Sequence, residues 1–230
     1  MKKSIADDLA RTVIAPNRMD LPAEVIEFSI DQVLDEGLLK DIPIVGWIAK
    51  GISTANSISD VIFFNKIVRF LYALEGVDPE VQQDCRAKMS VDTHYRRRVG
   101  EHLVLIIDKL DSLQKAEVLA KCFKHFLDGD MDHDRFMDLS HVVDRSSLAD
   151  LKAISVPDSQ RITFRDQGLA ASSGILEYGL TEAWDDEQKP ELGTRLSKLG
   201  KDLQDILLCR FKNRIASERK QRRTMEELMR

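Results

Sequence analysis

The chain has 230 residues, enough for one large domain or for two smaller domains that each have a core. Hydrophobic residues make up 43% and charged residues 32%, which excludes a wholly disordered chain. The net charge of −5 argues against a protein surface that coats DNA generally. Aromatic residues are scarce at 6%, and few glycines and prolines are present, which favours long helices over a turn-rich β-sandwich.

The first residues and the cysteines predict a cytoplasmic protein. Met1–Lys3 begins like a signal peptide, but three charged residues within the next eight positions interrupt any apolar segment. The chain also lacks an uncharged apolar run of about 18 residues, the length that a membrane-spanning helix requires. The three cysteines are odd in number and widely spaced, which is typical of thiols in a reducing compartment. Because Cys122 and Cys209 lie in apolar helical stretches, we expect both to be buried.

Residues 1–40 are predicted to form N-terminal helices, and residues 41–144 a helical bundle with hydrophobic helices at its centre. A turn at Pro16-Asn17 separates two helical stretches in the first part. Val61–Leu74 is apolar on nearly every side, which is typical of a helix in the middle of a bundle. We therefore expect its apolar residues and Trp47 to be buried. Four further helices are expected between residues 78 and 144, joined by short connections.

Ile42–Phe64 has an alternative interpretation as a membrane-active segment. Only Lys50 and Asp60 are charged within it, and Trp47 is compatible with a helix at a membrane interface. The polar side carries Ser and Asn, however, where a membrane-surface helix carries Lys and Arg. A buried helix pair is therefore the favoured interpretation, and membrane insertion is not expected.

Two polar clusters in the bundle have a structural and a functional interpretation. Asp128–Asp134 alternates aspartates as a calcium loop does, but His133 replaces the turn glycine and Leu139 replaces the bidentate glutamate of that motif. We expect instead that Gly129 ends one helix and that the aspartates lie at the start of the next. The run Tyr95–Arg98 is expected to be a solvated helix face with local acidic partners. No metal and no cofactor are predicted.

Residues 145–209 are expected to form a small winged-helix-like α+β domain. A short helix around Ser147–Ile154 and a helix over Gln167–Tyr178 precede two short strands, Leu180–Trp184 and Thr194–Ser197, and a helix up to Leu207 follows. The segment Arg195–Leu203 resembles the junction x-L-T-x-L-G-x-x-L between strand and helix in bacterial winged-helix domains. The resemblance implies a fold and carries no function.

Residues 210–230 are expected to be a basic helical tail. The predicted contacts with nucleic acid or an acidic partner are Arg161, Arg165, Arg214, Arg219, Lys220, Arg222 and Arg223. Signatures of catalysis such as G-x-S-x-G, a phosphate-binding glycine loop or H-E-x-x-H do not occur in the sequence, so we do not expect an enzyme.

The sequence as a whole predicts a mainly α protein of the bacterial type, acting as a binding or regulatory module for a protein partner. Two alternatives stay open: weak or regulatory DNA binding through the winged-helix-like domain and the tail, and membrane activity through Ile42–Phe64. The helix that would read DNA contains no basic residue, which argues for protein over DNA. The prediction of a binding module is also compatible with a homo-oligomer.

Overall fold

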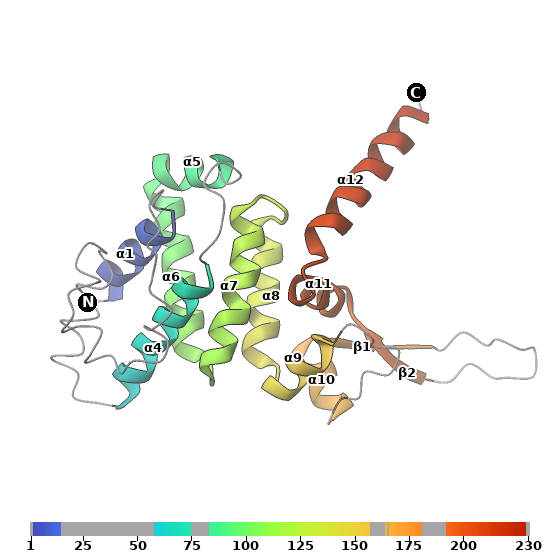
Figure 1. The fold of residues 1–230 in the computed structure, drawn as a ribbon, viewed down its shortest axis with the longest axis horizontal. Coiled ribbons are helices and arrows are strands. Elements are labelled where there is room, and N and C mark those ends of the chain that lie inside the picture. The colour runs from blue at the N-terminus through green and yellow to red at the C-terminus, as the bar shows by residue number, and fades with distance from the viewer. Residues whose placement is uncertain are drawn as a thin grey trace, which may run out of the picture. The chain divides into compact units, whose positions relative to one another are not determined.

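The structure is a computed structural model that describes residues 2–14, 58–74, 83–156, 164, 166–180 and 192–228. These residues form ten helices and one two-stranded antiparallel sheet (Figure 1). The mainly helical fold with a small sheet is therefore confirmed. The chain divides into two compact units, Met1–Gly129 and Asp130–Arg230. The second predicted N-terminal helix, Trp47, and most of Ile42–Phe64 lie outside the described residues.

The first unit consists of helices that pack side against side. Its helices are α1 (Lys2–Ile14), α4 (Ile58–Ala73), α5 (Gln83–Val91), α6 (Thr93–Lys109) and α7 (Leu113–Leu127). Helix α1 packs on α6, and α4 packs on α7 and α6. Local capping sets two of the helix starts, because Asp92 accepts a hydrogen bond from the Tyr95 amide and Ser112 accepts one from the Lys115 amide.

Helices α1 and α6 meet at a crossing that depends on small residues. A Cβ atom on Gly100 of α6 would lie 2.1 Å from the backbone oxygen of Ala6, so no larger residue fits there without a shift of α1. Arg96 of α6, which is 8% exposed, donates from Nε to Asp7 Oδ1 of α1 at 3.0 Å. The prediction of a solvated basic run is thus confirmed for Arg97, which pairs with Glu101 one turn away, and wrong for Arg96.

Helix α4 is buried on one side only. Phe64, Ile67, Phe70 and Leu74 recur at three- and four-residue steps and are buried. Ile62 is 46% exposed, so the prediction that every apolar residue of Val61–Leu74 is buried was wrong. Ile58 is also exposed, and the other apolar residues of α4 that are not buried are half-buried. Among the described helices, none is long and apolar enough to cross a membrane.

The second unit combines short helices with the hairpin. It contains α8 (His133–Arg145), α9 (Leu148–Ile154), α10 (Gln167–Ser173), β1 (Leu176–Leu180), β2 (Leu192–Leu196), α11 (Lys198–Leu207) and α12 (Phe211–Leu228). Helix α8 packs on α10 and α11, and α11 also packs on α9, β2 and α12. By its contacts, α8 belongs to the second unit.

The hairpin begins earlier than the sequence indicated. Helix α10 ends at Ser173 because Gly174 adopts a left-handed φ of 94°, and the Gly174 and Ile175 amides donate to the carbonyls of Ala171 and Ala170. Strand β1 therefore starts at Leu176, inside the helix that was predicted over Gln167–Tyr178. The prediction of that helix was wrong in its last five residues, since Gly174 ends it rather than Gly179.

Candidate functional site

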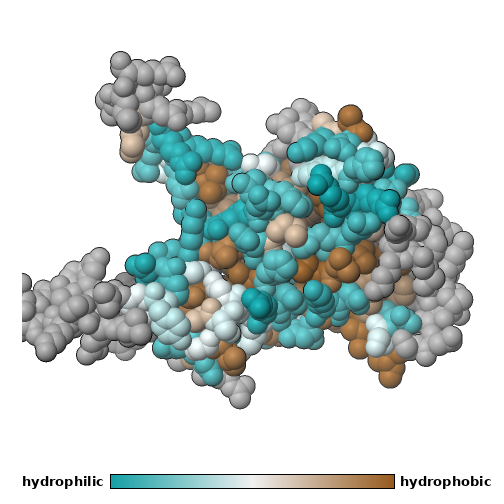
Figure 2. Space-filling view, turned by 180° about the vertical axis from the view of Figure 1, so that it is seen from behind, coloured by the Kyte–Doolittle hydropathy of each residue, from teal (hydrophilic) through white to brown (hydrophobic). Residues whose placement is uncertain are grey.

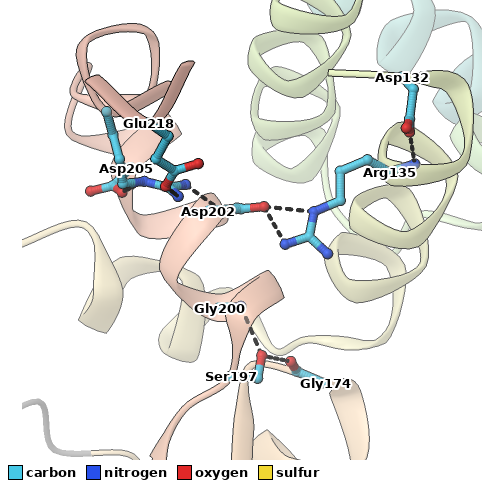
Figure 3. Close-up of polar contacts among 9 residues, drawn as sticks. Asp132, Arg135, Gly174, Ser197, Gly200, Asp202, Asp205 and Glu218 are labelled. Carbon is cyan, nitrogen blue, oxygen red and sulfur yellow. Dashed lines mark hydrogen bonds and ion pairs between the residues drawn. The ribbon is translucent and has the colours of Figure 1, made fainter. Parts of the chain in front are cut away.

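An ion-pair cluster joins three helices of the second unit (Figure 3). Asp202 of α11 is 3% exposed and accepts a hydrogen bond from Nε of Arg135, on α8, at 2.6 Å. Its other carboxylate oxygen contacts Nη2 of Arg214, on α12. Arg214 also donates from Nε to Asp205 at 2.6 Å and from Nη1 to Glu218 at 2.8 Å. We call Arg135, Asp202, Asp205, Arg214 and Glu218 the α11 ion-pair cluster.

The surroundings of Arg214 hold it in the charged form. Burial alone lowers the pKa of a guanidinium, but the hydrogen bonds and negative charges of Asp202, Glu218 and Asp205 outweigh that effect. The pKa of Arg214 is therefore raised above its ordinary value. All three of its nitrogens face carboxylates of the same unit, so this residue fixes the base of α12 on α11.

The other predicted contact residues differ in where they lie. Arg219, Lys220 and Arg222 are on α12 and are exposed. Arg223 belongs to the same helix, but its side chain is outside the described part of the chain, as are Arg161 and Arg165 altogether. The predicted contact residues that the structure describes thus all lie on α12. Arg214 differs from the others because it is part of the α11 ion-pair cluster.

A second feature of this unit is a pair of exposed apolar side chains, one on α10 and one on the hairpin. Leu169 on α10 is 65% exposed, and Tyr178 on β1 is 59% exposed. Helix α10 packs on β1, and Thr194 donates a hydrogen bond to Gln167 at 3.2 Å while lying opposite Tyr178 in the strand register. We call Gln167, Leu169, Tyr178 and Thr194 the α10–β1 surface.

The junction between β2 and α11 holds the end of α10 and the start of β1 in place. Ser197 donates from Oγ to the Gly174 carbonyl at 2.6 Å and accepts from the Gly200 amide at 2.9 Å (Figure 3). The Ser197 amide donates to Ile175 O, and a Cβ atom on Gly200 would lie 2.1 Å from that same oxygen. The serine and the glycine of Arg195–Leu203 therefore hold α11 against the turn between α10 and β1.

Sequence reasoning did not find the α10–β1 surface. It placed Leu169 and Tyr178 on one continuous helix, whereas the chain reverses between them. The signal that separates them is Gly174, which precedes a run of residues with strand propensity.

The aspartate-rich segment between α7 and α8 has the capping roles that the sequence predicted. Gly129 adopts a left-handed φ of 72° directly after the end of α7. Asp132 accepts a hydrogen bond from the Arg135 amide at 2.8 Å and caps α8. Within the described residues, no three His, Cys, Asp or Glu side chains are grouped closely enough to hold a metal ion.

The described cysteines differ in their exposure. Cys122 is buried in α7, as predicted. Cys209 is exposed, and the prediction of a buried thiol was wrong there. It lies in the turn between α11 and α12 with φ of 57°, because the apolar helix that contains Leu203 and Ile206 ends before reaching it.

Comparison with protein-family models, curated proteins and solved structures finds no significant match for this chain.

Proposed function

We propose that the chain is a non-enzymatic binding module of the cytoplasm and that its second unit binds a protein partner on the α10–β1 surface. The observation that carries this proposal is the exposure of two large apolar side chains, Leu169 at 65% and Tyr178 at 59%, on packed secondary structure. Tyrosine is enriched among the residues that dominate the binding energy of protein interfaces, and an exposed leucine adds apolar area that a partner can bury.

The hydrogen bonds that hold α10 in place favour binding at this surface. Helix α10 is capped at its start by Asp166, which accepts from the Leu169 amide at 3.0 Å, and at its end by Gly174. Ser197 ties the end of α10 to the start of α11. A surface whose backbone is already ordered loses less conformational entropy when a partner binds.

The arrangement of elements supports a winged-helix-like domain. The order α9, α10, hairpin, α11 is the one expected of such a domain, with α10 in the place of the reading helix. A helix that reads DNA presents Arg, Lys, Asn or Gln, and α10 offers only Gln167. The sequence between β1 and β2 adds five acidic residues and one lysine, which disfavours phosphates. This balance of charge supports a protein partner over DNA.

The test compares what three forms of the full chain capture from cells of the native host. The first is the wild type, and the second carries Leu169→Gln and Tyr178→Thr. The third is a matched control with Leu105→Gln and Val91→Thr, which alters two exposed apolar side chains of the first unit. Circular dichroism first establishes that all three have the same helix content.

The proposal predicts a protein that the wild type and the control capture in equal amounts and the α10–β1 variant does not. Equal capture by all three forms would place the partner elsewhere on the chain. If the wild type captured no protein in excess over a blank resin, the proposal would be wrong.

A further inference from the structure

Helix α12 presents basic residues on the side that is turned away from its own packing. At about 100° per residue, positions 212, 219 and 223 fall within about 40° of one another around the helix axis. Lys212 and Arg219 occupy the first two positions and are exposed, and Ala216 between them is exposed as well. The residue at position 223 is also an arginine. We call positions 212, 219 and 223 the basic stripe.

The packing of the opposite side of α12 explains why Lys212 and Arg219 are exposed. Phe211 is 1% exposed, and Arg214 and Glu218 belong to the α11 ion-pair cluster. These contacts fix the rotation of the helix about its axis, and they leave Lys212 and Arg219 exposed. Beyond Glu218, every residue of α12 whose exposure is described is exposed. Helix α12 extends away from α11 in Figure 1, and its surface is largely hydrophilic in Figure 2.

The charge of α12 is opposite to that of the chain. Over its residues Phe211–Leu228, α12 has six cations and three acids, although the net charge of the whole chain is −5. Four of these six cations are arginines. The guanidinium fork suits bidentate contact with phosphate oxygens.

We infer that α12 binds the phosphate backbone of duplex nucleic acid without reading its sequence. The stripe extends over twelve residues, about 16 Å along the helix, which is long enough to contact several phosphates. A membrane surface fits less well, because the one large apolar side chain of α12 that is described as exposed is Met225. This binding is independent of the protein partner proposed for the α10–β1 surface.

The expected affinity follows from the number of contacts and from the acidic remainder of the chain. We expect a dissociation constant of about 10⁻⁴–10⁻⁶ M near physiological salt, which is the range of non-specific binding. With three to four phosphates contacted, raising the salt from about 50 to about 200 mM should weaken binding by about 40- to 150-fold.

The experiment measures fluorescence anisotropy of a labelled random-sequence duplex with the full chain at these two salt concentrations. The test variant carries Lys212→Glu, in the basic stripe, and Lys220→Glu, an exposed cation beside the stripe on α12. The matched control carries Lys109→Glu and Lys121→Glu, two exposed lysines of the first unit, so both variants change the net charge equally. Vesicles of anionic lipid serve as a second probe for every protein.

We expect the control to bind the duplex like the wild type and the test variant to bind at least about tenfold more weakly, with a shallower salt dependence. Equal weakening of both variants would show that only net charge matters, and it would overturn the assignment to α12. If the protein bound vesicles but not the duplex, the inference would be wrong, and the ligand of α12 would be a membrane surface. Duplex binding by the wild type that is unaffected by salt would also contradict the inference.

Discussion

At the scale of single residues, buried charges connect segments that are far apart in the sequence. Arg96 reaches Asp7 across 89 positions, and Arg135 reaches Asp202 across 67. A pattern of helical spacing shows which residues share a face of one helix, but it does not show which residue of a distant helix lies opposite. For that reason the sequence placed Arg96 at the surface and did not indicate that Arg214 pairs with Asp202.

Asp202 provides the sharpest test of these buried charges. Replacing Asp202 with Asn removes the negative charge between Arg135 and Arg214 and leaves two partly buried guanidinium groups without it. We expect a loss of about 3–5 kcal/mol in the free energy of unfolding, measured in urea. Glu101→Gln breaks the exposed pair with Arg97 and should cost at most about 1 kcal/mol. Similar small losses in both variants would show that the α11 ion-pair cluster does not hold the unit together.

Asp7 makes the stability of the first unit depend on pH. Partial burial alone raises the pKa of Asp7, but the hydrogen bond and charge of Arg96, together with Arg11, outweigh it, so that the pKa lies below the ordinary 3.8. A lowered pKa in the folded state means that the carboxylate stabilises the fold fully above 3.8 and less as the pH falls through the folded value.

We therefore expect wild type to exceed Asp7→Asn in stability at neutral pH, and the difference to shrink as the pH falls below 3.8. Urea unfolding of both forms over this pH range measures the difference. A difference that stayed constant with pH would mean that Asp7 acts through its shape and not through its charge.

At the scale of elements, periodicity and capping residues predicted most of the described helices. Ser147 begins α9 and Ser197 begins α11, each by accepting a hydrogen bond from an amide three residues on. Such signals are local, and local signals are visible in a sequence. The errors arose where a choice depended on the surroundings: which of two glycines ends α10, and which side of α4 is covered.

Two isoleucines on α4 test the corrected view of that helix. Ile67 is fully buried and Ile62 is 46% exposed, although the sequence places both in one apolar run. We expect Ile67→Ala to cost about 2–5 kcal/mol in the free energy of unfolding, because it leaves a cavity. Ile62→Ala should cost less than about 1 kcal/mol. The same chemical denaturation measures both, and equal losses would restore the prediction of a helix buried on every side.

At the scale of the whole molecule, the second unit carries two surfaces with different chemistry. Helix α10 and β1 present apolar side chains without positive charge, and α12 presents cations. The sequence located the basic helix, because its composition is visible directly. It did not reveal the α10–β1 surface, because Leu169 and Tyr178 are nine residues apart and meet the same partner only if the chain reverses at Gly174.

The two surfaces are expected to act independently. The variant with Leu169→Gln and Tyr178→Thr should bind duplex like the wild type, and the variant with Lys212→Glu and Lys220→Glu should keep the protein partner. This separation distinguishes a failure of one proposal from a failure of the other.

The central claim is that the α10–β1 surface binds a protein, and its most direct test is an affinity. The captured partner is purified, and its dissociation constant is measured by calorimetry for the wild type, for the α10–β1 variant and for the control with Leu105→Gln and Val91→Thr. Truncating a residue that dominates an interface costs about 2 kcal/mol or more, so the α10–β1 variant should bind at least about 30-fold more weakly. The control should match the wild type. An unchanged dissociation constant for the α10–β1 variant would contradict the account.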